Sequence, residues 1–259
     1  MKHNIKVTLI LIGLFLIAQY MGLFINYKYQ EQALPFGIER PEMTEFSFFN
    51  LFGIIIFVTL IAFLLARFKF AKLWKLWFFI ASWFTLVIAF AVFVDQKFAM
   101  LIGFIGAVFK VFEIDIYIHN LTELFIYGGL TAIFAPLFSM WSISIFLVII
   151  AIYDAIAVWK TKHMIKLAKF QSKLKVFAGL LVPYGKKRAA ILGGGDIGFT
   201  LLFAAVAMRT LGVRALIIPA VVGISLFLLL VYGDKNKFYP AMPYLSAGCF
   251  IGYGLSLLL

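Results

Sequence analysis

Two aspartates lie inside apolar stretches of this chain, where an ionisable side chain is costly. Asp154 occurs in the run SIFLVIIAIYDAIAVWK and Asp196 in the run ILGGGDIGFTLLFAAVAM. Inside a bilayer an aspartate costs roughly 3 kcal/mol on insertion scales, so an ionisable residue there indicates a functional site. Two of them in successive apolar runs suggest a pair that acts together.

Two close carboxylates in a low-dielectric site cannot both ionise cheaply, so they share one proton. The ionised member can take a proton from a water that attacks an amide carbon, while the protonated member donates to the carbonyl oxygen. This is the chemistry of an aspartic protease. A proton or cation relay is the other use that membrane proteins make of such carboxylates.

The composition indicates a polytopic membrane protein of the all-α class. Of 259 residues, 64% are hydrophobic and only 13% are charged, whereas soluble domains are nearer half apolar and a quarter charged. Apolar runs bounded by charged or turn residues predict nine transmembrane helices. They cover residues 5–27, 46–66, 76–94, 98–112, 121–138, 140–159, 189–208, 215–232 and 239–259.

Basic residues collect at alternate ends of these helices, which sets the expected orientation. Most of the 23 Lys and Arg residues fall on one side if the N-terminus is cytoplasmic, as the positive-inside rule requires. With nine spans, the C-terminus is then extracytoplasmic. The net charge of +12 therefore reflects topology and not nucleic-acid binding. The basic cytoplasmic loop over residues 160–188 suits either an interfacial helix on anionic lipids or an ordinary solvated loop.

The same topology places the two aspartates at similar depth. Asp154 lies six residues before Lys160, about 9 Å of helical rise, and Asp196 lies eight residues after Arg188, about 12 Å. Both distances start from the cytoplasmic boundary, so we expect the two carboxylates to face each other.

Small and aromatic residues flank the aspartates. Gly193, Gly194 and Gly195 directly precede Asp196, which lets another backbone approach closely, although glycines also simply pack membrane helices. Tyr153 offers a hydroxyl beside Asp154, or packs as an aromatic residue.

Three short motifs follow one another along the chain: Tyr153-Asp154, then Gly193-Gly194-Gly195-Asp196 (the pattern Gly-x-Gly-Asp), then Pro240-Ala241-Met242-Pro243. Together they closely resemble the ordered signatures of presenilin and signal peptide peptidase proteases, and most closely those of archaeal presenilin homologues. The resemblance implies one membrane-embedded protease domain over residues 1–259. Its first five helices lie within 1–138, and the catalytic helices six to nine lie within 139–259.

By this resemblance Asp154 and Asp196 are the catalytic pair, with active-site support from Tyr153, Gly193, Gly194 and Gly195. Substrate contacts are expected from Pro240, Ala241, Met242 and Pro243, although prolines also commonly start helices. The family has Leu where this chain has Met242. Because Met and Leu have similar volumes, we expect activity to survive this difference.

The expected function is therefore an intramembrane aspartyl protease that hydrolyses peptide bonds within the helices of single-span substrates. We expect it to be a multi-pass protein of the cell membrane, in contact with lipids. The predicted orientation matches presenilin-type enzymes and, by the resemblance, favours substrates with an outside N-terminus. The alternatives are a transporter or cation channel, for which no inverted repeat is evident, and a prepilin-type peptidase, which shares only the Gly-x-Gly-Asp aspartate.

Other chemistries lack the residues they need. No His-Glu-x-x-His motif for zinc is present, and no Gly-x-Ser-Gly nucleophile occurs, so we expect no metal or cofactor. His119 and His163 fall near loop ends and are expected to be solvated or near lipid headgroups. Asn120 begins a glycosylation sequon, but the predicted topology puts it inside.

A transmembrane helix hides its own amides, so a protease must unwind it. An extended segment of substrate can then pair with a strand-like edge of the enzyme. Residues 175–190 and the approach to Pro240 are the candidates for that edge.

Overall fold

The computed structural model describes residues 4–39, 53, 71–113, 115–161, 177–184, 188–234 and 239–259. The helix predicted over residues 46–66 and most of the loop over residues 160–188 lie outside this part of the chain. The described residues are mostly helical, as predicted.

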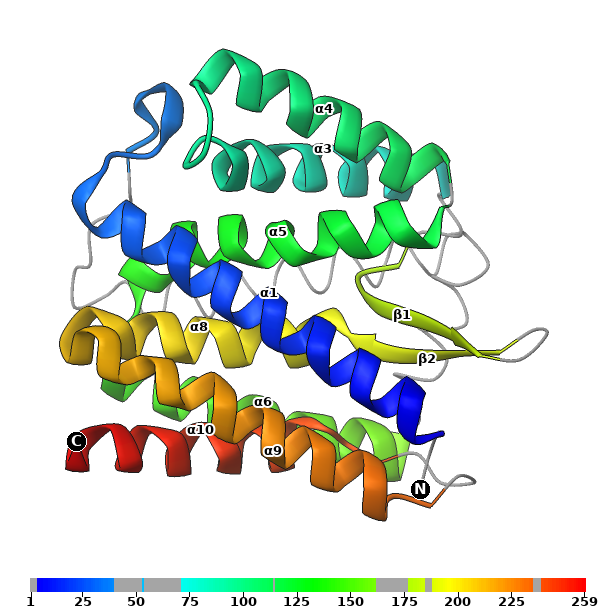
Figure 1. Ribbon diagram of the computed structural model, residues 1–259, viewed down its shortest axis with the longest axis vertical. Helices are drawn as coiled ribbons and strands as arrows, with labels where there is room; N and C mark the ends of the chain where they lie inside the picture. The colour runs from blue at the N-terminus through cyan, green and yellow to red at the C-terminus, as the bar shows by residue number, and fades with distance from the viewer. Residues whose placement is uncertain are drawn as a thin grey trace.

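Eight long helices correspond to eight of the predicted spans, with ends that differ by a few residues (Figure 1). They are α1 (Ile5–Glu31), α3 (Ala71–Phe90), α4 (Gln96–Phe112), α5 (Ile116–Phe134), α6 (Met140–Ile156), α8 (Gly194–Leu211), α9 (Ile217–Tyr232) and α10 (Met242–Leu258). Three short 3-10 turns follow α1, α5 and α8: η1 (Pro35–Gly37), η2 (Ala135–Leu137) and η4 (Gly212–Leu216). A π-helical turn, η3 (Ala157–Thr161), extends α6.

Several of these helices are apolar and long enough to cross a membrane. By length and composition they are Ile5–Glu31, Lys72–Phe90, Met140–Lys160 and the stretch Gly194–Tyr232, which contains α8 and α9; Met242–Leu258 is a shorter apolar helix. The chain is thus an integral membrane protein. The N- and C-termini lie at opposite ends of the bundle in Figure 1. The count of nine spans and the orientation stay predictions.

Polar side chains at the helix starts explain where the helices begin. The side-chain oxygens of Asn4, Asp95, Asp115 and Ser139 accept backbone N–H bonds at the first turns of α1, α4, α5 and α6. Such caps satisfy amides that the helix itself leaves unpaired. Helix α5 therefore begins at Ile116, right after Asp115, and not at Leu121 as the apolar run alone suggested.

Helix α8 is the centre of the bundle. It packs against α1, α5, α6, α9 and α10, and Phe203 at its middle makes edge-on ring contacts with Phe250 and Tyr253 of α10. Every residue from Leu201 to Met208 is buried, as expected for a helix that is apolar on all sides.

A β hairpin departs from the all-α class, and its first strand lies within residues 175–190, where a strand-like edge was predicted. Strands β1 (Gly179–Tyr184) and β2 (Arg188–Gly193) pair antiparallel, with Leu181 opposite Ile191 and Gly179 opposite Gly193. The predicted helix over residues 189–208 therefore starts as a strand and becomes helical only at Gly194. Burial alternates along the strands, with Leu180, Val182, Ala190 and Leu192 buried and Ile191 56% exposed, which is the period of a half-buried sheet.

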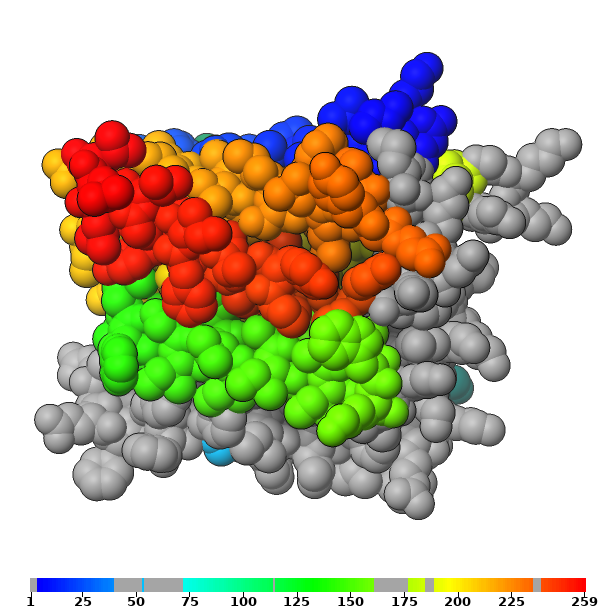
Figure 2. All heavy atoms as spheres, turned by 90° about the horizontal axis from the view of Figure 1, so that it is seen from below, coloured from blue at the N-terminus to red at the C-terminus, as the bar shows by residue number. Residues whose placement is uncertain are grey.

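The outer surface of the bundle is apolar. Figure 2 shows α9, α10 and α6 side by side on one face. Large side chains on these helices are exposed, among them Trp141 at 77%, Ile224 at 59% and Ile251 at 57%. A surface of this kind suits contact with lipid.

Glycines allow close approach between neighbouring helices. A Cβ at Gly129 of α5 would overlap the carbonyl group of Thr85 in α3, and a Cβ at Gly22 of α1 would overlap Leu201 of α8. Small residues serve in this way throughout membrane bundles.

We expect Gly129→Ala to lower the melting temperature of the detergent-solubilised protein, because the added methyl group pushes α3 away from α5. Overpacking of this kind costs about 1–3 kcal/mol. Gly13→Ala in α1 is the matched control, since nothing lies within 4 Å of the Cβ it adds. The control should keep or raise the melting temperature because Ala favours helix. Equal melting temperatures for the two variants would contradict this packing.

Candidate active site

Asp154 lies near the end of α6 and faces α10. Its side chain is 8% exposed, and its carboxylate oxygen Oδ2 accepts a hydrogen bond of 3.0 Å from the backbone N–H of Met242. This bond directly joins the first and third sequence motifs, which lie 88 residues apart in the chain. The aspartate thus has a defined orientation, set by the first residue of α10.

Asp196 is the third residue of α8 and is half-buried. Its carboxylate turns back toward the start of the helix, because a Cβ at Gly193 would lie 3.2 Å from Oδ2 of Asp196. The N-terminus of a helix carries partial positive charge that favours a carboxylate. The glycine therefore leaves this carboxylate room over the helix end.

The two aspartates occur at the same end of the bundle. Helices α6 and α8 pack together, with the rings of Phe146 and Phe199 in edge-on contact at 5.7 Å. Asp154 follows Phe146 and Asp196 precedes Phe199, so both lie on the same side of that contact in two antiparallel helices. Figure 1 shows the end of α6 and the starts of α8 and α10 at this end, beside the hairpin.

The proline motif reaches the site through its backbone. Pro240 is buried, Ala241 and Pro243 are half-buried, and the Met242 side chain is 3% exposed within the main core. Because the bond to Asp154 comes from the backbone N–H of Met242, it does not depend on whether the side chain is Met or Leu.

Among the three glycines, Gly194 has the tightest surroundings. Its N–H donates to the Ala178 carbonyl at 3.0 Å, and a Cβ there would lie 2.8 Å from the Tyr127 hydroxyl and 3.2 Å from the Ala178 carbonyl carbon. A Cβ at Gly195 would meet only Phe199, at 3.3 Å. The close backbone approach expected of this motif occurs at Gly194, where the hairpin meets α8.

A family model described as signal-peptide peptidase, presenilin aspartyl protease matches residues 12–259 of the chain. The chain belongs to this family. It is therefore an aspartyl protease and a hydrolase, as the three motifs predicted. Both aspartates and the motif over residues 240–243 fall within the matched range. No curated protein matches the chain.

Two solved structures of a presenilin family intramembrane aspartate protease share the fold. The structure in space group C222 has a TM-score of 0.69 and 19% sequence identity, and the match covers 97% of this chain and 98% of the other. The structure in space group P2 has the same score and identity, and the match covers 96% of each chain. This presenilin-family chain therefore keeps the architecture at low sequence identity.

Tyr153 lies on the outer face of α6. Its side chain is 57% exposed, whereas the neighbouring Asp154 points inward. The role of Tyr153 in active-site support stays a prediction.

Helix α1 fixes the start of α8 through a residue that the sequence did not single out. Gln19 is 1% exposed, and its amide group donates to the Ile197 carbonyl and the Thr200 hydroxyl, both at 2.9 Å. The Thr200 hydroxyl in turn donates to the Asp196 carbonyl at 2.8 Å. A buried polar residue in an apolar run is the signal that identifies Gln19.

A buried polar cluster on α4 and α5 was also missed. Lys110 of α4 forms an ion pair with Glu123 of α5, and the Tyr127 hydroxyl donates to the other oxygen of Glu123. The expectation that His119 is solvated is wrong, because His119 is 8% exposed and its ring lies against the hairpin. The spacing of four between residues 119, 123 and 127, which puts them on one helix face, was the available signal.

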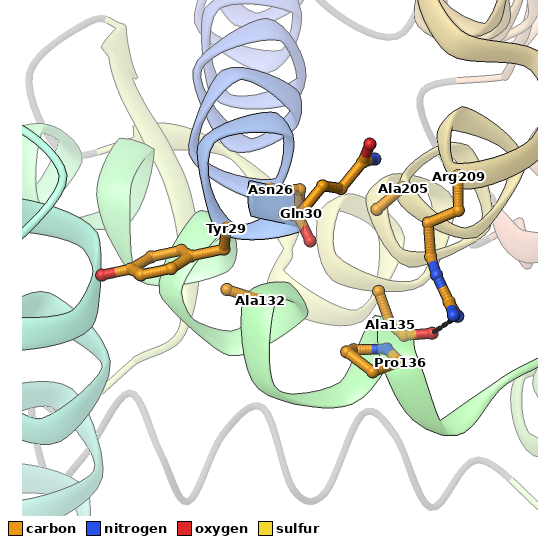
Figure 3. Close-up of a pocket in the computed structure, with 8 residues that line it drawn as sticks. All are labelled: Asn26, Tyr29, Gln30, Ala132, Ala135, Pro136, Ala205 and Arg209. Atoms are coloured by element: carbon orange, nitrogen blue, oxygen red, sulfur yellow. Dashed lines mark hydrogen bonds between the residues drawn. The ribbon is translucent and has the colours of Figure 1, made fainter. Parts of the chain in front are cut away.

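Two of the cavities formed by the described residues help to define the extent of the site. One of about 480 Å³ lies between α9 and α10 beside Pro243, with Tyr232, Tyr239 and Tyr244 in its wall. The other, of about 280 Å³, has Asn26, Tyr29, Gln30, Ala132, Ala135, Pro136, Ala205 and Arg209 in its wall (Figure 3). Arg209 lies about 20 Å along α8 from Asp196, so the second cavity is not part of the site. Among the described residues no group of metal-binding side chains occurs.

We expect Gly194→Ala to reduce both the melting temperature and proteolysis more strongly than Gly195→Ala. The methyl group at position 194 meets the Tyr127 hydroxyl and the Ala178 backbone, and such overpacking costs about 1–3 kcal/mol. The matched variant at position 195 needs only a small shift of the Phe199 ring. Thermal unfolding in detergent and cleavage of a single-span reporter measure the two effects. A larger loss at position 195 would show that the contact with Ala178 is unimportant.

Proposed function

We propose that this presenilin-family protease cleaves single-span membrane proteins within their transmembrane helices, with Asp154 and Asp196 as its catalytic pair. The observation that carries the proposal is the hydrogen bond from the Met242 N–H to Asp154. This bond connects the buried carboxylate of Asp154 to the proline motif. Both lie at the end of the bundle where α8, which carries Asp196 in its first turn, begins. We place the enzyme in the cell membrane, where its substrates and lipids are its partners.

The two carboxylates share one proton, because two negative charges in an apolar site are unfavourable. The ionised carboxylate takes a proton from water as that water attacks the peptide carbonyl carbon. The protonated carboxylate donates its proton to the carbonyl oxygen, which gives a tetrahedral diol. The carboxyl group that took the water's proton then passes it to the amide nitrogen as the C–N bond breaks, and the other carboxylate takes a proton from a diol hydroxyl, so that the amine and the carboxylic acid leave and the pair again shares one proton. Asp154 keeps its orientation through the Met242 N–H, and the half-exposed Asp196 is open to water.

Substrate recognition begins with an unwound segment, because a helix hides its own amides. The hairpin offers an edge for such a segment. On β1, Gly179 and Leu181 bond to α5 side chains, so the cross-strand bonds of the hairpin use the alternate residues. On β2, the N–H groups of Ala189, Ile191 and Gly193 therefore point away from β1, and within the described chain they have no partner.

An extended substrate adds to β2 as a third strand. The edge ends at Gly193, three residues before Asp196. A substrate segment paired along β2 therefore has its peptide groups close to the carboxylate of Asp196. Main-chain hydrogen bonds hold the segment in the extended form that cleavage requires.

Ile191→Pro tests this edge. Proline removes the outward N–H and is tolerated at a strand edge, so the hairpin should persist while cleavage of a single-span reporter falls about tenfold. Ile191→Ala is the matched control, because it shortens the same half-exposed side chain and keeps the N–H. If both variants cleave at the wild-type rate, the strand-addition step is refuted.

Asp154→Asn and Asp196→Asn test the catalytic pair. Each substitution keeps the shape of the side chain and removes the acid, so purified protein in liposomes should lose all cleavage of the reporter. Asp95→Asn is the control, because Asn also caps a helix well and Asp95 caps α4. Persistent cleavage in either active-site variant would end the proposal. Wild-type protein that conducts ions across liposome membranes but does not cleave the reporter would instead favour a transporter or channel that uses the aspartates as a proton or cation relay.

A further inference from the structure

The buried polar cluster on α5 is costly, and its contacts show what it does. Lys110 is 4% exposed, Glu123 is 1% exposed and His119 is 8% exposed, although charged groups in apolar surroundings are unfavourable unless fully paired. The two aspartates and the proline motif make no use of this cluster. Its remaining bonds go to strand β1.

Three side chains of α5, which we call the edge cap, bind the outward side of β1: His119, Asn120 and Glu123. The N–H of Gly179 donates to Glu123 at 3.0 Å, and the Gly179 carbonyl lies 2.8 Å from the His119 ring nitrogen Nε2. The Leu181 N–H donates to the Asn120 amide oxygen at 2.9 Å, and the Asn120 amide nitrogen donates back to the Leu181 carbonyl at 2.7 Å. The cap thus makes the bonds that a neighbouring strand would make.

The third outward-facing residue of β1 is Pro183. Proline has no backbone N–H, so this position offers no donor to a neighbouring strand. Every outward N–H position of β1 is therefore closed, by Glu123, by Asn120 or by the proline ring. The outward N–H groups of β2 bond to no described residue, so within this part of the chain the hairpin has one closed edge and one open edge.

Further hydrogen bonds to Lys110 and Tyr127 fix the position of Glu123 in the edge cap. Glu123 accepts hydrogen bonds from Lys110, Tyr127 and the Gly179 N–H, so its carboxylate is fully satisfied. The Tyr127 hydroxyl also occupies the space where a side chain at Gly194 would lie. The cap is thereby connected to the start of the helix that carries Asp196.

We propose that the edge cap is a positioning element of the protease, which fixes the hairpin beside Asp196 and leaves the β2 edge of the hairpin open to substrate. This inference rests on the proposed function. His119, Asn120 and Glu123 act through the hairpin and not on the reacting atoms. Loss of the cap leaves the aspartates in place but lets the hairpin move, so the substrate strand is presented in more than one register.

Asn120→Ala is the most direct variant, because it removes both bonds to Leu181 from a half-buried position. We expect kcat/KM for a single-span reporter to fall about tenfold, and product masses to show cleavage spread over several neighbouring peptide bonds. Hydrogen exchange of the segment over residues 177–184 should become faster. Asn120→Gln keeps an amide and should restore much of the rate and the single cleavage position.

Thr122→Val is the matched control on the same helix. Thr122 is 4% exposed, but its hydroxyl donates to the His119 carbonyl of its own helix and, among the described residues, makes no bond to the hairpin. Its rate should stay within about threefold of the wild type, with cleavage positions unchanged. If Asn120→Ala does not fold, Leu181→Pro removes the strand's side of the same bond and should give the same spread of products.

The outcomes separate the two proposals. Wild-type protein that cuts no reporter contradicts the proposed function, and hydrogen exchange of the hairpin in Asn120→Ala still tests the cap. Folded Asn120→Ala that matches the wild type in rate, cleavage position and hairpin exchange overturns the cap. An equal spread of products in Thr122→Val overturns it as well, because the effect then belongs to α5 in general.

Discussion

The described charged and amide side chains buried in this bundle pair with other polar groups, because an unpaired one in apolar surroundings loses its hydration without compensation. The structure satisfies this constraint with a few connected sets. Asp154 is joined to the amide of Met242, Glu123 receives three donors, and Gln19 bonds to the first two turns of α8. Each set links segments far apart in the chain. Together they fix the starts of α8 and α10 against α1, α5 and α6, and so determine the geometry of the site.

The cost of burying polar groups also explains which features could be predicted from the sequence. Asp154 and Asp196 were found because a carboxylate in an apolar run is anomalous, and eight helices were found because apolar runs of sufficient length have few other structures. The hairpin was harder to place. Residues 189–192 are apolar, and a short apolar run does not distinguish strand from helix. The edge cap was missed because its partners on β1 lie 56 to 61 residues away, a pairing that no local pattern contains.

The contacts of Met242 explain why we expect this departure from the family pattern to be tolerated. The residue contributes its backbone N–H to Asp154 and its side chain to the main core. The first contribution is common to every residue except proline, and the second requires only an apolar side chain of similar volume. The contact of residue 242 with Asp154 therefore does not depend on which apolar side chain the residue carries.

The proposed addition of substrate to the edge of β2 has a consequence for selectivity. A strand edge binds peptide groups, which are the same in every protein, so it discriminates little among side chains. What differs between two membrane helices is the free energy needed to break their internal hydrogen bonds, which is lower where glycine or proline interrupts them. If substrate adds to β2 as we propose, the enzyme selects its substrates by how easily their helices unwind locally, and a helix without such weak points is protected whatever other side chains it displays.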